Sequence, residues 1–253
     1  MSAALQELRD RLDEIKVDLT FVALALQLRP RIAGVVRFEP SGEVVDLVTR
    51  FINAKTVRPE GIYGPLMVRL LASLERYMRK VVGQAVAYKN KAAPNYDAIR
   101  DSLGKRNIAL TGRLLGNIDS PPDHLALDFT LLIQNLASCT NKGGAFLLNP
   151  EAFSATVSVP TPGVVEKALS HIGVKNLWDA LGGSPELQKA LGTRKSRDTG
   201  KEAKDRLTEL CRWRNHLAHG GDAETALSET QLREAIDFTA AFAEALDDVV
   251  MDG

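Results

Sequence analysis

The chain has 253 residues, of which 45% are apolar and 25% are charged, so it can bury a real core and is not a disordered chain. Its 32 basic and 32 acidic residues cancel, which disfavours a general polyelectrolyte binder. Two cysteines, Cys139 and Cys211, are too few for a disulfide scaffold or a four-cysteine zinc site. No signal peptide or membrane span is visible, which predicts a cytoplasmic protein with no membrane partner.

The N-terminal segment has the pattern of an amphipathic helix. Leucine and isoleucine side chains recur at spacings of three and four from Leu5 to Leu19, and charged residues fill the other side. We expect this helix to run over about residues 3–27. It should stop before Pro30, because a proline pushes the preceding residue out of the helical region.

Two more helices are predicted before the middle of the chain. Residues 32–40 are short and β-like, and residues 43–53 are expected to be helical. After a connector, Pro65 stands where a helix would start, since its missing N–H costs nothing there. Apolar residues at helical spacing extend this long helix to about Ala87 or beyond.

The middle of the chain is predicted to continue as helices and loops. Helices are expected over residues 94–115 and from Pro121 to about Asn141. Residues 145–162 are expected to form a loop with a short strand at 154–159.

The last third contains a short helix, a loop and two longer helices. The short helix covers residues 164–173 and ends at a glycine, and residues 182–200 form the most loop-like region. Residues 201–221 are expected to be helical. Ser228 and Gln231 form a capping box at the start of the last helix.

These elements predict an all-α fold. We see no internal repeat and no sharp break in composition, which favours one helical domain over residues 61–253. Residues 1–60 would be an N-terminal helical extension that regulates or recruits rather than catalyses.

Residues 201–221 carry the chemistry of the chain. Arg214 falls in the middle of an apolar stripe, where an unpaired charge would be too costly to bury. It should therefore meet a carboxylate, or the face should be a cleft or a subunit interface. His219 stands just before two glycines at the negative end of the helix dipole, a position that favours the protonated ring.

The run from Arg214 to Gly220 resembles the R-N-x-x-A-H-G signature of HEPN-domain proteins, in particular the ribonuclease-L-like and phage-defence-associated families. The resemblance extends over roughly residues 60–250 and implies a HEPN-like helical bundle. In that superfamily an Arg and a His with four to six residues between them form an RNA-cleaving site. Arg214 provides the four-residue spacing to His219, and Arg212 provides the six-residue spacing.

The resemblance implies a metal-independent endoribonuclease that acts without a cofactor, as a toxin or an antiviral defence effector. The catalytic residues would be Arg214, His219 and Asn215. Arg214 would stabilise phosphoryl charge, His219 would move a proton, and Asn215 would orient either group. The products would be a 2′,3′-cyclic phosphate and a 5′-hydroxyl. The partners would be RNA, a second copy of the chain in a homodimer, and an antitoxin or sensor subunit.

Supporting roles are assigned to Arg212, His216 and Glu75, each of which is also explained as an ordinary surface residue. Glu75 is as much a candidate ion-pair partner for Arg214 as a plain surface acid. The basic stretch before the motif helix is either a solvated linker or an edge that contacts RNA phosphates. Its candidate RNA-binding residues are Arg194, Lys195, Arg197 and Lys201.

Other chemistry is disfavoured. Packing is favoured over base stacking for Trp213, and Cys211 is interpreted as a core residue. His124 and His171 have no supporting neighbours. His216 and His219 are three residues apart but lack an acidic or thiol ligand, so no metal site is predicted. The main alternative function is a non-catalytic HEPN interaction module that binds a partner protein or nucleotide. A nucleotide-binding accessory of a nucleotidyltransferase is a second alternative.

Overall fold

The computed structural model describes residues 1–35, 60–119, 127–140, 145–218 and 227–251. Within these ranges every regular element is helical and none is a strand, which confirms the all-α prediction. The elements in chain order are α1 (Ala3–Val35), α3 (Glu60–Ala92), α4 (Tyr96–Ile99), the π-helical turn η1 (Arg100–Gly104), α5 (Lys105–Gly116), α6 (Phe129–Ser138), α7 (Pro150–Ser154), α8 (Pro162–His171), α9 (Leu177–Gly182), α10 (Pro185–Leu191), α11 (Ser196–Ala218) and α12 (Glu229–Met251).

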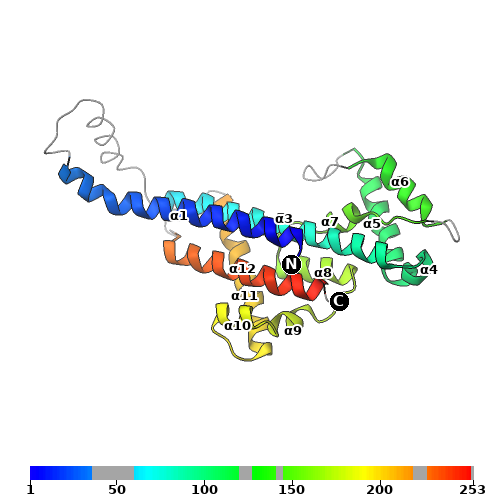
Figure 1. Ribbon diagram of the computed structural model, residues 1–253. Helices are drawn as coiled ribbons and strands as arrows, with labels where there is room; N and C mark the ends of the chain where they lie inside the picture. The colour runs from blue at the N-terminus through cyan, green and yellow to red at the C-terminus, as the bar shows by residue number, and fades with distance from the viewer. Residues whose placement is uncertain (36–59, 120–126, 141–144, 219–226, 252–253) are drawn as a thin grey trace.

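The long helices α1, α3 and α12 lie side by side and form the centre of the bundle (Figure 1). Helices α4, α5 and α6 gather at the C-terminal end of α3, whereas α9 and α10 pack against α12 and α11 packs against α3. Tyr77 of α3 is buried and donates its hydroxyl to the carbonyl of Ala243 in α12, 2.8 Å away. This bond ties the two central helices together inside the core.

The N-terminal helix belongs to the same core. The apolar stripe from Leu5 to Leu19 is buried against α3 and α12. On its rim Arg69 of α3 donates to Asp18 of α1 at 2.7 Å. The predicted boundary at residue 60 stays a prediction, but the described part of α1 packs as a structural helix of the bundle.

Two helix boundaries near prolines were predicted wrongly. Helix α1 continues through Pro30 to Val35, so it does not stop before the proline, and residues 32–35 are helical rather than β-like. Helix α3 starts at Glu60 and holds Pro65 inside it. A proline removes one backbone hydrogen bond, at a cost of about 3 kcal/mol, and these helices of 33 residues continue past that loss. The helix predicted at 43–53 lies outside the described residues.

The middle of the chain also departs from prediction. Helix α6 begins at Phe129, where the Asp128 carboxylate accepts from the backbone N–H of Leu131, and not near Pro121, which lies outside the described residues. The strand predicted at 154–159 is absent there. That segment instead forms turns after the short helix α7, with backbone hydrogen bonds such as the one from Val157 N–H to the carbonyl of Ser154.

The stretch predicted as a loop at 182–200 is also mostly helical. Two of its glycines, Gly182 and Gly200, are contact points between helices, whereas Gly192 ends α10 with a φ of 64°. A Cβ on Gly182 would strike the backbone of Ser196, and a Cβ on Gly200 would strike the backbone carbonyl of Trp178. Glycine at these positions allows α9 and α11 to cross in backbone contact. The sequence shows where these glycines are, but it does not show that two helix backbones touch at them.

Other predictions are confirmed. Helix α8 ends at His171 and is followed by Gly173 with a φ of 96°, as expected for a glycine after a helix. The capping box of α12 forms, since the Ser228 hydroxyl accepts from Gln231 N–H at 3.1 Å and the Gln231 side chain accepts from Ser228 N–H at 2.9 Å.

Candidate functional site

Helix α11 carries the motif and is fixed at both ends. Its first turns cross α9 at Gly200, and the side of the helix that includes Leu207 and Cys211 is buried. Near its C-terminal end, Leu217 packs so closely on α3 that a Cβ on Gly64 would lie 3.1 Å from its side chain. The helix is therefore a rigid support for the motif residues up to Ala218.

Arg214 is partly exposed and is not sealed in the core. Its Nη1 donates to the Asn215 side-chain oxygen at 3.3 Å, which brings together two of the predicted catalytic residues. Within the described ranges Arg214 has no ion pair with a carboxylate. The two sequence-based explanations of its position were a carboxylate partner or an open face, and the described residues agree with the open face.

Glu75 does not pair with Arg214. Its carboxylate accepts from Arg79, four residues on in α3, and Arg79 also donates to the Val157 carbonyl at 3.0 Å. Glu75 is close enough to Cys211 to influence it electrostatically. Glu75 is thus a neighbour of the motif helix, but its ion pair is with Arg79 of its own helix.

Cys211 lies in the core beside the motif, as predicted. Burial is the main reason that the pKa of its thiol is raised to about 11, and the charge of Glu75 raises it further. The positive charge of Arg214 lowers that pKa but does not offset the burial. The thiol is therefore protonated at neutral pH and unsuited to act as a nucleophile.

An open hollow of about 390 Å³ lies next to the motif, on the exposed side of α11. We call it the α11 hollow, and the described residues that line it follow the i, i+3, i+4, i+7 spacing of one helix face: Glu209, Arg212, Trp213 and His216. The sequence-based interpretation overlooked Glu209 and favoured packing over base stacking for Trp213. The spacing of the four residues was the available signal.

Both of the predicted supporting residues on this helix line the hollow. Arg212 is exposed, as expected, whereas His216 is only partly exposed rather than fully solvent-facing. His219, Gly220 and His124 lie outside the described residues. The arrangement of His219 relative to Arg214 or Arg212 therefore stays a prediction.

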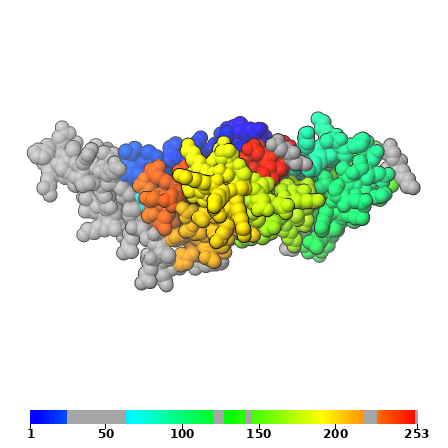
Figure 2. All heavy atoms as spheres, turned by 90° about the horizontal axis from the view of Figure 1, so that it is seen from below, coloured from blue at the N-terminus to red at the C-terminus, as the bar shows by residue number. Residues whose placement is uncertain are grey.

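The predicted RNA-binding residues lie far from the motif. Arg194, Lys195, Arg197 and Lys201 are all exposed. Arg197 and Lys201 lie in the first turns of α11, and Arg194 and Lys195 lie just before it, within the yellow region in the middle of the face seen in Figure 2. With a rise of about 1.5 Å per residue, Arg197 lies about 26 Å along the helix from Arg214. These residues do not contact the same phosphate as Arg214 of their own chain.

No metal or membrane feature occurs in the part of the chain that the structure describes. There, no three His, Cys, Asp or Glu side chains are grouped so that they could hold a metal ion. None of the helices searched is both long and apolar enough to cross a bilayer.

Comparison with known proteins identifies the family. No curated protein and no solved structure matches the chain. A family model described as RiboL-PSP-HEPN matches residues 54–252, which include the long helix α3, the motif helix α11 and the last helix α12. Since the match covers well over half of the sequence, the chain belongs to the RiboL-PSP-HEPN family.

Proposed function

We propose that this protein is a metal-independent endoribonuclease, active as a homodimer and serving as a toxin or an antiviral effector in the cytoplasm. The observation that carries the proposal is the state of Arg214. It is a partly exposed guanidinium, bonded to Asn215 and without a carboxylate partner in the described residues, on a rigid helix of a HEPN-family protein. A pure scaffold has no need of an arginine held in this way.

The proposed reaction uses the 2′-OH of the RNA as the nucleophile. The 2′-oxygen attacks the adjacent phosphorus and loses its proton, the bond from phosphorus to the 5′-oxygen breaks, and the 5′-oxygen gains a proton. The products are a 2′,3′-cyclic phosphate and a 5′-hydroxyl. Charge that builds up on the phosphoryl oxygens in the transition state would be stabilised by the planar fork of Arg214.

His219 would carry the proton in this reaction. An imidazole titrates near neutral pH and serves as either acid or base, so it suits both the 2′-OH and the 5′-oxygen. Asn215 would orient Arg214 through the bond between their side chains. The partly exposed face around Arg214 is where a second protomer would bring its own motif close to the first.

The experiment is cleavage of a mixed RNA in the presence of EDTA, followed by analysis of the product ends. We expect cleavage, cyclic-phosphate ends, and resistance of a substrate with 2′-deoxyribose at the scissile nucleotide. Cleavage that needs a divalent metal would refute the mechanism. Binding of RNA or nucleotide without any cleavage would instead favour the alternative, a non-catalytic interaction module.

A further inference from the structure

The α11 hollow adjoins the motif but plays no part in the reaction proposed above. Trp213 lies in its wall and directly precedes Arg214 in the chain. The hollow of about 390 Å³ is open to solvent, and its described lining comes from one helix face, so it offers a surface on which a flat ring can lie rather than an enclosed pocket. If Arg214 holds the phosphate of a nucleotide, the neighbouring hollow is in the right place for the base of that nucleotide.

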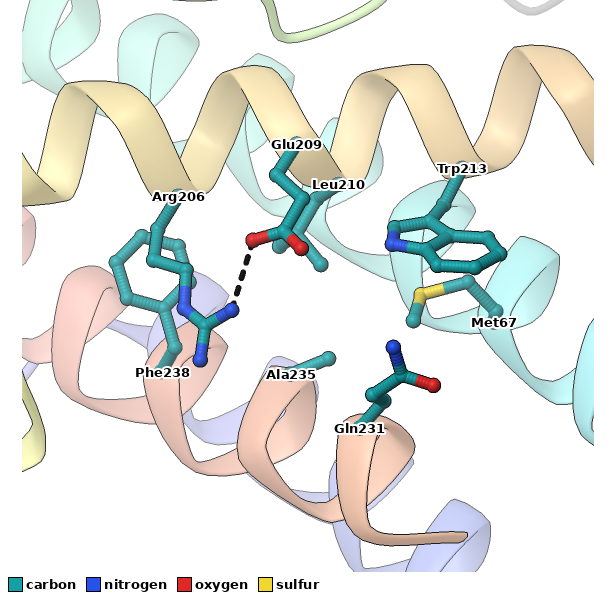
Figure 3. A pocket seen from close by; sticks show the side chains of 8 residues that line it. All are labelled: Met67, Arg206, Glu209, Leu210, Trp213, Gln231, Ala235 and Phe238. Carbon is teal, nitrogen blue, oxygen red and sulfur yellow. Dashed lines mark hydrogen bonds and ion pairs between the residues drawn. The ribbon is translucent and has the colours of Figure 1, made fainter. Parts of the chain in front are cut away.

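The indole of Trp213 is fixed in place from its inner side. It is partly exposed, packs against the core, and lines a second, much smaller cavity with Met67 and Leu210. Figure 3 shows the side chain of Met67 next to the indole ring. A ring held in this way loses little freedom when a flat molecule stacks on it, which is the property of a base-stacking platform.

The hollow offers a hydrogen-bond acceptor for a base and a cation for a phosphate. Glu209 lines both cavities, and its carboxylate accepts from Arg206 at 2.7 Å, which holds it in position (Figure 3). A carboxylate held in this way accepts hydrogen bonds from the exocyclic amino group of a base. Arg212 is exposed and has no ion pair among the described residues, so its charge is available for a flanking phosphate.

We propose that the α11 hollow binds a nucleobase of single-stranded RNA, stacked on Trp213 and hydrogen-bonded to Glu209, next to the phosphate that Arg214 would hold. This inference rests on the proposed ribonuclease function and names its substrate as unpaired RNA. Adenine and cytosine, which present an amino group, are preferred to uracil, whose N–H lies between two carbonyl oxygens that a carboxylate repels.

Tryptophan fluorescence tests the proposal directly, because Trp178 and Trp213 are the two tryptophans of the chain. The ligand is a six-residue oligoadenylate with 2′-O-methyl groups, which cannot be cut by 2′-OH attack. In Trp178→Phe protein the remaining indole, Trp213, should be quenched on binding. In Trp213→Phe protein the signal of Trp178, which donates to Glu166 at 3.1 Å on another helix, should stay unchanged.

Affinity provides the second readout. Trp213→Leu should weaken binding of the oligoadenylate by about 5- to 150-fold, the equivalent of about 1–3 kcal/mol for one stacked base. A circular-dichroism melt verifies that the variant is folded. In wild-type protein the matching oligouridylate should bind more weakly than the oligoadenylate, and Glu209→Gln should narrow that difference.

The outcomes separate this inference from the proposed function. If unmodified RNA is cut but folded Trp213→Leu protein binds and cuts like wild type, the inference is wrong and the ribonuclease stands. If wild-type protein does not cut RNA but the oligoadenylate quenches Trp213, the proposed function is wrong and the base site stands. Equal binding of oligouridylate and oligoadenylate would overturn the role of Glu209.

Discussion

Replacement of Gly200 by alanine tests how the motif helix is positioned. Gly200 is a buried residue in α11, and a Cβ there would strike the carbonyl oxygen of Trp178 well inside the 3.0 Å that real Cβ atoms keep. Because this neighbour is backbone, α9 and α11 would have to move apart. Overpacking of this kind costs about 1–3 kcal/mol, more than the gain of about 0.8–1.0 kcal/mol in helix propensity from glycine to alanine.

Gly112→Ala is the matched control. Gly112 lies in α5, is exposed, and would have nothing within 4 Å of a new Cβ. This variant should gain about 0.8–1.0 kcal/mol, whereas Gly200→Ala should lose stability. Thermal unfolding measures both, at about 2–4 °C per kcal/mol for a protein near this size. A Gly200→Ala protein as stable as Gly112→Ala would show that α9 and α11 do not cross in backbone contact.

Three further predictions concern the core, the thiol and the assembly. Leu12→Ala should lower the free energy of unfolding by about 2–5 kcal/mol in denaturant, because Leu12 is buried. Val17→Ala, at a side chain that is 67% exposed, should change that free energy little. Equal effects of the two substitutions would refute the packing of α1. Since burial raises the pKa of Cys211 from its ordinary value near 9 to about 11, the folded state binds more protons than the unfolded state between these values. The free energy of unfolding should therefore fall as pH rises from about 9 to about 11. It should fall less in Cys211→Ala protein, and the same dependence of stability on pH in wild type and variant would contradict this prediction. Light scattering at micromolar concentration should find a homodimer, and an active, monodisperse monomer would rule out pairing of the motif helices.

The sequence predicted the helical fold well because the buried stripes repeat at helical spacing. The stripe from Leu5 to Leu19 and the capping box at Ser228 are local patterns that tertiary contacts reinforce. Prolines were harder to interpret, since Pro30 and Pro65 lie inside long helices that continue past the lost hydrogen bond. A rule about the residues next to a proline does not include the stability that the remaining turns of a long helix provide.

The site was predictable where it depends on a motif and not where it depends on tertiary contacts. The sequence correctly predicted a motif helix with a buried Cys211 and an arginine that is not in the core. It left open whether Glu75 pairs with Arg214, because the competing partner Arg79 depends on side-chain rotamers. The α11 hollow was missed because the sequence shows the spacing of Glu209, Arg212, Trp213 and His216 but not whether that helix face stays open in the fold.

The most direct test of the central claim is the rate of RNA cleavage by His219→Ala protein in EDTA, compared with wild type and with His124→Ala. General acid–base groups contribute about 10²–10⁴-fold, so the His219 variant should lose detectable cleavage while its fold is unchanged. His124 has no assigned role, and its variant should cut at the wild-type rate. Cleavage by His219→Ala at the wild-type rate would contradict the account.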